Sequence, residues 1–309
     1  MAWGRFTIWR STRAGRVEGP TLGVAAVIYA GWLAVTLGHR HLPTAITVTA
    51  LGVLGAWQTS LQHEVIHGHP FRSRAANHAL AWLPVTLWVP YGDYRDSHLA
   101  HHRSPELTDP RQDPESFYVD PDRWATAGRL TRRWLQLNQT LAGRLALAPV
   151  VTTLTYWWWA VTPLRSSFRR RALISHVAGV TVVLVWVVGV CHLPLWVYAA
   201  GAWYLGRCLS FVRSFCEHRW VEGDGTRSAV VRAGRLWSLL FLNNNLHHTH
   251  HARPGAPWYR LPLLARSLGS DDLAAGGAGW YPGYGAVFRR YALRPFDRPQ
   301  HPAHARTEA

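Results

Sequence analysis

Three histidine-rich stretches could support chemistry in this chain of 309 residues. They read HEVIHGH at residues 63–69, HLAHH at 98–102 and NNNLHHTHH at 243–251. On a helix, side chains three or four positions apart lie on one face. This spacing predicts that the following rings point together: His63 with His67; His98 with His101 and His102; His247 with His250 and His251. Because imidazole is a common metal ligand, the pattern predicts metal binding.

Eight such rings exceed the needs of one metal ion. Structural zinc takes four ligands, and catalytic zinc takes three and keeps one position open. Two ions that share eight or nine imidazoles, each with an open position, fit the number better. Imidazole suits Zn, Cu, Fe and Ni, and the oxidation of an unactivated C–H bond by O₂ favours iron. We therefore expect two non-haem iron ions.

The first stretch also contains HEVIH, which matches the HExxH motif of zinc proteases. In those enzymes two histidines bind the metal and the glutamate, here Glu64, is the general base. A membrane zinc metalloprotease is therefore an alternative of another class. It would leave most of the other rings unexplained, so we interpret Glu64 instead as an acceptor that orients a ligand ring.

The elements that must position these rings are apolar. Hydrophobic residues make up 48% of the chain and charged residues only 16%. The charge-free run 172–206 would be about 52 Å long as one helix, which is too long for a bilayer core of about 30 Å, so it must turn back. We place the turn at Cys191–Pro194, because the residue before a proline leaves the helical region. The pattern predicts two transmembrane hairpins with spans at about 21–39, 43–61, 172–190 and 193–211.

The charge distribution orients these hairpins. The net charge is +16, and the basic residues, all arginine, flank the apolar runs rather than interrupt them. By the positive-inside rule all three histidine stretches then face the cytoplasm. Basic residues that flank spans favour this topology over nucleic-acid binding, and we expect no nucleic-acid partner.

The remaining segments complete an all-α integral membrane fold. The apolar pieces 79–90 and 145–162 contain prolines and are expected to be interfacial or re-entrant, with a true span at 145–162 as the alternative. The chain after about residue 212 is expected to form a cytosolic helical cap that carries the histidine stretches. We predict one domain over residues 1–297 and a disordered tail over 298–309.

These features together resemble a known family. HEVIHGH, HLAHH and HHTHH are similar to the three histidine boxes of the integral-membrane fatty acid desaturase and hydroxylase superfamily, and the likeness extends over roughly residues 20–265, including WYRLP at 258–262. The resemblance implies a di-iron enzyme that uses O₂ and two electrons to desaturate a lipid or fatty acyl chain. Lipid or carotenoid hydroxylation or ketolation on the same centre is the alternative.

The resemblance also implies a ligand set. Carried over to this chain, it comprises His63, His67, His98, His101, His102, His247, His250 and His251. Acyl-CoA desaturases of the superfamily add a histidine before the third box, for which His218 is the matching candidate, and an asparagine near the metal, for which Asn243 and Asn244 are the candidates. His69 and His248 are expected to be proton or hydrogen-bond partners. Four carboxylates near the second box could accept N–H bonds from ligand rings: Asp93, Asp96, Asp109 and Asp113.

The chain carries no sequence motif for haem, flavin or an iron–sulfur cluster. Electrons must then come from a separate donor, such as a ferredoxin and its reductase, and an arginine-rich face would suit an acidic carrier. The expected location is a bacterial inner membrane, with a lipid or acyl substrate and the histidine boxes on the cytoplasmic side.

Overall fold

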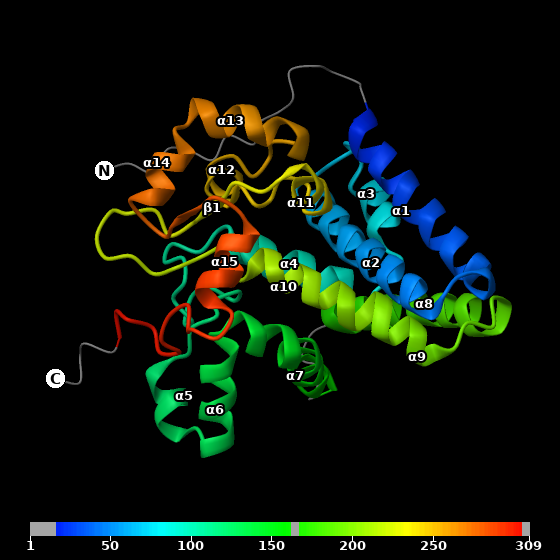
Figure 1. Ribbon diagram of the computed structural model, residues 1–309, viewed down its shortest axis with the longest axis horizontal. Helices are drawn as coiled ribbons and strands as arrows, with labels where there is room; N and C mark the ends of the chain where they lie inside the picture. The colour runs from blue at the N-terminus through cyan, green and yellow to red at the C-terminus, as the bar shows by residue number, and fades with distance from the viewer. Residues whose placement is uncertain (1–16, 162–166, 305–309) are drawn as a thin grey trace.

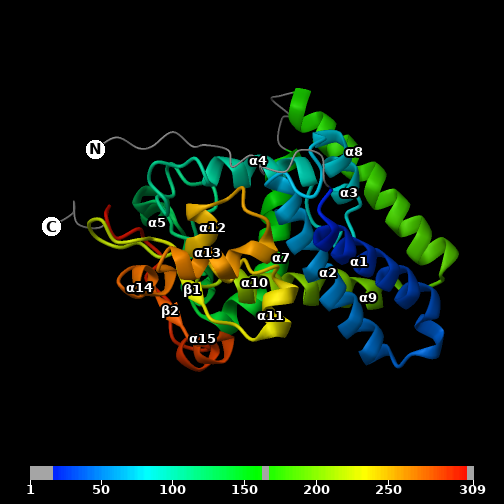
Figure 2. The ribbon, with the colours of Figure 1, turned by 90° about the horizontal axis from the view of Figure 1, so that it is seen from above.

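The computed structural model describes residues 17–161 and 167–304. In both ribbon views the long helices gather at one end of the molecule and shorter elements form a cap at the other (Figure 1, Figure 2). The long helical segments are α1 (Gly19–Gly38) with the turn η1 (His39–His41), α2 (Thr44–Ile66), α7 (Leu141–Val161), α8 (Ser167–Leu184) with its π-helical end η2 (Val185–Val190), and the continuous run α9 (Leu195–Tyr198), η3 (Ala199–Leu205) and α10 (Gly206–Ser214). The long helices thus form one part of the molecule, and the cap packs against one end of them.

Short elements build the cap and its connections. They are α3 (Arg74–Ala81), α4 (Tyr91–His101), α5 (Pro121–Thr126), α6 (Arg129–Asn138), α11 (Arg235–Leu240), α12 (His247–Ala252), η4 (Trp258–Arg260), α13 (Leu261–Ser267), α14 (Ser270–Ala275), α15 (Tyr284–Tyr291) and the strands β1 (Val230–Val231) and β2 (Trp280–Tyr281). The two strands pair in parallel, with Val230 opposite Trp280. The fold is therefore mostly helical, as predicted.

A helical segment covers most of each of the four predicted spans. The break between the last two lies where it was predicted, since η2 ends at Val190 and α9 begins at Leu195. Gly19–His41 and Arg170–Val190 are long and apolar enough to cross a bilayer. Helix α2 continues past the predicted end at residue 61 to Ile66, and this extension carries the first histidine box into the cap.

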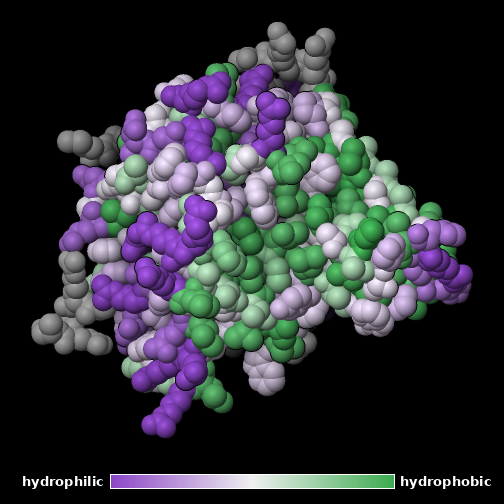
Figure 3. Space-filling model, viewed as in Figure 1, coloured by the Kyte–Doolittle hydropathy of each residue, from purple (hydrophilic) through white to green (hydrophobic). Residues whose placement is uncertain are grey.

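Large apolar side chains remain exposed along the long helices. Figure 3 shows a broad hydrophobic area over these helices and a hydrophilic area over the cap. The exposed residues include Val27, Leu33 and Leu37 on α1, Leu154, Trp158 and Trp159 on α7, and Ile174, Val177 and Val182 on α8. A contiguous apolar surface of this kind marks a membrane or protein contact.

The two segments expected to lie at the interface differ from each other. Residues 82–90 form an irregular connection between α3 and α4. Helix α7 is regular, contains Pro149, and packs against η3 and α10.

Close backbone approach joins the two hairpins. A Cβ added at Gly55 of α2 would lie 2.7 Å from the carbonyl oxygen of Ala202, and one added at Gly201 would lie 2.8 Å from that of Val48. Because the obstructing atoms belong to the backbone, neither can rotate away. Glycine at these positions lets α2 and η3 pack at short range.

We expect Gly55→Ala to lower the stability of the protein by about 1–3 kcal/mol, because the added methyl group forces the two helices apart. Thermal unfolding in detergent, followed by tryptophan emission, measures the change. Gly23→Ala on α1 is the control, since nothing lies within 4 Å of its added Cβ. Equal melting temperatures for the two variants would contradict the packing argument.

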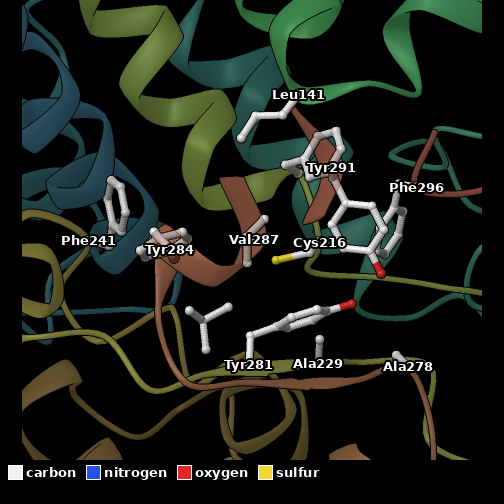
Figure 4. Close-up of a cluster of buried hydrophobic side chains, with 12 residues drawn as sticks. Leu141, Cys216, Ala229, Phe241, Ala278, Tyr281, Tyr284, Val287, Tyr291 and Phe296 are labelled. Atoms are coloured by element: carbon white, nitrogen blue, oxygen red, sulfur yellow. The ribbon is translucent and has the colours of Figure 1, made fainter. Parts of the chain in front are cut away.

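A buried, largely aromatic cluster joins β2 and α15 to the chain that follows α10. Cys216 lies among Tyr281, Val287 and Tyr291, which come from β2 and α15 (Figure 4). All four side chains are buried. This cluster fixes the start of the chain after α10, two residues before His218.

The end of the described chain is ordered against the cap, which corrects the prediction of a disordered tail for residues 298–304. Val119 forms a parallel bridge with Gln300. His301 is buried, with its Nε2 3.2 Å from the hydroxyl oxygen of Thr108. The low-hydrophobicity composition of this segment gave no sign of these contacts, which are made with residues almost two hundred positions away. The rest of the predicted tail, 305–309, lies outside the described residues, as do residues 1–16 of the predicted domain.

Candidate metal centre

Short helical pieces present each histidine box. His63 lies in the last turn of α2, and His67 is the residue that ends this helix. His98 and His101 lie in the last turn of α4 and His102 follows it, whereas the third box is almost the whole of α12. Each box therefore lies on or directly after a helix, so that rings three or four positions apart share one face, as the sequence predicted.

The nine predicted ligands form two groups. Their ligand atoms lie within 4.8 Å of one another inside each group, which comprise His63, His67, His98, His102 and His250 in the first and His101, His218, His247 and His251 in the second. The groups adjoin, because the rings of His102 and His251 stack with centroids 4.3 Å apart. All nine residues are thus brought together, including His218.

Each HxxHH box is divided between the two groups. In the second box the i, i+4 pair His98 and His102 belongs to the first group and His101 to the second. In the third box the assignment is reversed, since His247 and His251 belong to the second group and His250 to the first. The boxes therefore bridge the two sites and do not each serve one of them.

The distances between ring nitrogens fit metal coordination. Within the groups, neighbouring Nε2 atoms lie 2.9–3.3 Å apart, as in the pairs His102–His250 and His101–His251. Two nitrogens about 2.0–2.1 Å from a common ion, at angles of about 90–110°, lie about 2.9–3.4 Å from each other. The observed spacing is that of ligands around an ion.

The pair His218 and His247 gives a second reason to expect a metal ion, because of where their ring hydrogens lie. His218 Nδ1 lies 3.2 Å from the carbonyl oxygen of Arg227, and His247 Nδ1 lies 3.2 Å from the Asn244 side-chain oxygen, so each Nδ1 carries the hydrogen. Burial lowers the pKa of His218 to about 3 and that of His247 well below its ordinary value, so both rings are neutral. Their Nε2 atoms, 2.9 Å apart, then present two lone pairs to each other. Such an arrangement suits two ligands of one cation.

Carboxylates hold two of the rings directly and a third through an asparagine. Asp113 accepts from His101 Nδ1 at 2.7 Å and Glu115 accepts from His98 Nδ1 at 3.0 Å. Glu217 lies 3.5 Å from His247 Nδ1 and accepts from the Asn244 amide at 3.1 Å. Partners of this kind fix the orientation of a ligand ring and raise its basicity.

Charge at the buried Asp113–His101 pair follows from these contacts. Burial by itself lowers the pKa of His101, but the hydrogen bond that its ring donates to Asp113 and the charge of Glu115 outweigh it, and the net direction is upward. For Asp113 burial raises the pKa, yet the hydrogen bonds from His101 and two backbone amides outweigh it and the net direction is downward. The carboxylate is therefore ionised where the second group needs negative charge.

The three asparagines before the third box have different roles. Asn243 has a positive φ of 56° and donates to the carbonyl oxygen of Trp258 at 3.0 Å. Asn244 connects His247 to Glu217. Asn245 donates to the carbonyl oxygen of Val231, which ties the turn to β1. Of the two candidates, Asn244 is the one that contacts a ligand ring.

Two predicted carboxylate partners lie elsewhere. Asp93 accepts from the hydroxyl of Tyr156, and Asp96 pairs with Arg95. Both residues are on the helix that carries the second box, but their side chains bond to α7 and to a sequence neighbour. The acceptors that sequence reasoning missed are Glu115 and Glu217. Glu217 stands directly before His218, which was the available signal.

The flanking histidines also lie outside the two groups. His69 Nδ1 bonds to Glu18 at 2.8 Å, and His248 Nδ1 lies 2.9 Å from the hydroxyl of Ser270. Asp109, considered with Asp113, instead lies 3.2 Å from the His304 ring. His248 is thus the ring of the third box that does not join the metal site.

Glu64 does not orient a ligand ring. Its carboxylate accepts from the backbone amide of Trp258 at 2.9 Å, and it is buried. Together with Asn243 it therefore holds the WYRLP segment against the end of α2. A protease of the HExxH type needs this carboxylate at the metal-bound water, and here it is engaged by the backbone.

Comparison with known proteins agrees with this site. The family described as Fatty acid desaturase matches residues 40–283, a range that contains all nine histidines of the two groups. A fatty acid desaturase of Bacillus subtilis (strain 168) is 24% identical over 240 residues, which cover 72% of this chain and 67% of the relative. The chain therefore belongs to the fatty acid desaturase family, as a membrane oxidoreductase.

Proposed function

We propose that this protein is an O₂-dependent di-iron enzyme that desaturates a lipid or fatty acyl chain with two electrons from an external donor. The observation that carries the proposal is the convergence of nine imidazoles into groups of five and four, in a chain of this family. When bound, the two irons would supply O₂ activation and the oxidation of an unactivated C–H bond. The overall change is balanced: the substrate loses two hydrogens to form a double bond, and O₂ takes up these, two electrons and two protons to give two waters.

The described residues support this chemistry around the metal. Asp113 and Glu115 hold rings by their Nδ1 atoms, Glu217 acts on His247 through Asn244, and these contacts direct the Nε2 atoms inward. Glu64 and Asn243 hold the Trp258 segment over the end of α2, next to the first group.

The membrane arrangement is part of the proposal. We infer four spans, in α1, α2, the segment of α8 with η2, and the segment of α9 to α10, with the boxes on the cytoplasmic side of a bacterial inner membrane. The distribution of arginines and the extension of α2 beyond the apolar stretch support this orientation.

The electron donor is proposed to be a small acidic carrier such as a ferredoxin, reduced by its own reductase. The cap surface is hydrophilic in Figure 3 and carries many of the arginines of a chain whose net charge is +16. Charge complementarity of this kind speeds association and weakens with added salt.

Lipid analysis of a host that expresses the wild type, together with a ferredoxin and its reductase, tests the proposal. We expect acyl chains that have lost two hydrogens and that are absent from a host expressing His250→Ala. A product that gains one oxygen instead would identify a hydroxylase or ketolase on the same centre. Identical profiles for the two hosts across lipid classes would overturn lipid oxidation.

A further inference from the structure

Three short segments of the cap carry highly exposed leucines where the cap meets the long helices. Leu130 of α6, Leu236 of α11 and Leu293 just after α15 are 86%, 85% and 82% exposed, more than any other large hydrophobic residue that the structure describes. Helices α6 and α15 pack against α7, and α11 packs against α2. The three segments therefore lie at the boundary between the cap and the long helices (Figure 1).

An arginine stands next to each of these leucines. The pairs are Arg129–Leu130, Arg235–Leu236 and Leu293–Arg294. All three arginines are exposed. The segments 129–138, 235–240 and 284–294 contain three, one and three arginines and no aspartate or glutamate. Each exposed leucine thus has a positive charge beside it and no acidic residue in its own segment.

The core of the cap does not use these exposed residues. In α15, Tyr284 and Tyr291 are buried in the largely aromatic cluster of Figure 4, whereas Phe288 is 52% exposed. In α11, Trp237 packs against the same cluster, whereas the neighbouring Leu236 does not belong to it. Each of these helices therefore has one apolar face for the core and further apolar residues on the outside.

Helix α6 has an apolar face that lies open to its surroundings. Leu130, Trp134 and Leu137 stand four and three positions apart, so they share one face of the helix. No residue of α6 is buried in the structure as described. Arg133 directly precedes Trp134 and is exposed. An apolar face beside basic residues is typical of helices that lie in the headgroup region of a membrane.

We propose that the three segments form a lipid-contact rim, in which the leucines enter the acyl layer and the arginines bind anionic phosphate groups of the adjoining leaflet. The apolar surface of α7, which includes Leu154 and Trp158, leads into this rim because α6 and α15 pack against α7. A bilayer that covers α7 therefore reaches them. The leucines distinguish a bilayer from an acidic soluble partner, which would match the arginines alone.

The rim is connected with the metal centre through the core of the cap. The cluster that receives α11 and α15 also contains Cys216, two residues before the ligand candidate His218. Contact at the rim therefore fixes the depth of the second metal group relative to the bilayer. This inference rests on the membrane character of the protein and not on the reaction at the histidine centre.

Spin labels in the full-length protein, reconstituted into bilayers of phosphatidylcholine and phosphatidylglycerol, test the apolar contact. Leu130→Cys, Leu236→Cys and Leu293→Cys each receive a nitroxide, and the wild type treated in the same way measures labelling of the native cysteines. We expect oxygen to reach all three labels and a water-soluble nickel chelate to be excluded from them. Leu273→Cys is the control, because this leucine is 52% exposed on α14, at the end of the cap away from the long helices (Figure 1, Figure 2). The nickel chelate should reach its label.

Thermal unfolding in the two kinds of bilayer tests the charge contact. The apparent melting temperature of the wild type should be at least about 2 °C higher with phosphatidylglycerol present than in phosphatidylcholine alone. A variant that combines Arg129→Gln, Arg235→Gln and Arg294→Gln should lose this difference. Arg266→Gln should keep it, because Arg266 is equally exposed but lies on α13, which packs against the cap helices α12 and α14.

Three outcomes would contradict the proposal. Rim labels that the nickel chelate reaches as readily as the control label would exclude insertion into the acyl layer. Labels shielded from both reagents would show a protein interface in place of lipid. Equal melting temperatures of the wild type in the two bilayers would exclude the arginine–phosphate contacts. Neither measurement involves iron or O₂, so such a failure with a positive lipid profile would leave the desaturase proposal standing.

Discussion

Replacement of His250 by alanine should empty the first metal group and abolish lipid desaturation. His250 comes from the third box, yet its Nε2 lies 2.9 Å from that of His102 in the first group, so its loss removes one ligand of five. We expect about one iron per chain instead of two, and desaturation lowered by more than about 100-fold, because both ions are needed for the reaction. Elemental analysis of the purified protein and lipid analysis of the host measure the two effects.

His248→Ala is the control for this prediction. The ring lies in the same helix and two positions away, but it bonds to Ser270 and belongs to neither group. The variant should keep both irons and show a smaller loss of activity. If His248→Ala lost iron and His250→Ala retained it, the division of the third box between the two groups would be wrong.

The Asp113→Asn variant should weaken metal binding in the second group. Asp113 is 2% exposed, accepts from His101 Nδ1 at 2.7 Å, and also accepts from the backbone amides of Thr108 and Glu115. The amide lacks the negative charge that raises the basicity of the His101 ring. We expect affinity for iron to fall by about 10–100-fold in this group only.

Iron retention during titration with a chelator measures this affinity, and the loss of one ion before the other is the expected signature. The control is Asp109→Asn, since Asp109 lies four residues earlier in the same loop but bonds to Arg111 and His304 rather than to a ligand ring. Retention curves that coincide for Asp113→Asn and the wild type would show that the carboxylate does not support the metal.

Local spacing explains why so much of the site was predictable. His63 and His67, or His98 and His102, lie on one helical face wherever their helix is placed, because the angle between them is set within four residues. The apolar runs and the Cys191–Pro194 turn are local in the same sense, and helices lie where the composition put them. His218 was reached only through its resemblance to a family pattern.

The tertiary structure decided how the boxes are shared and what supports them. Sequence spacing cannot show that His101 and His250 each cross to the other group, because that depends on how α2, α4 and α12 meet. Sequence spacing also cannot show that Glu115 and Glu217, rather than Asp93 and Asp96, are the partners of the ligand rings. All four are carboxylates close in sequence to a predicted ligand histidine, and only the folded chain decides which of them reach a ring. The sequence by itself thus determined the chemistry and the faces that carry it. Packing between distant segments determined which ring belongs to which group.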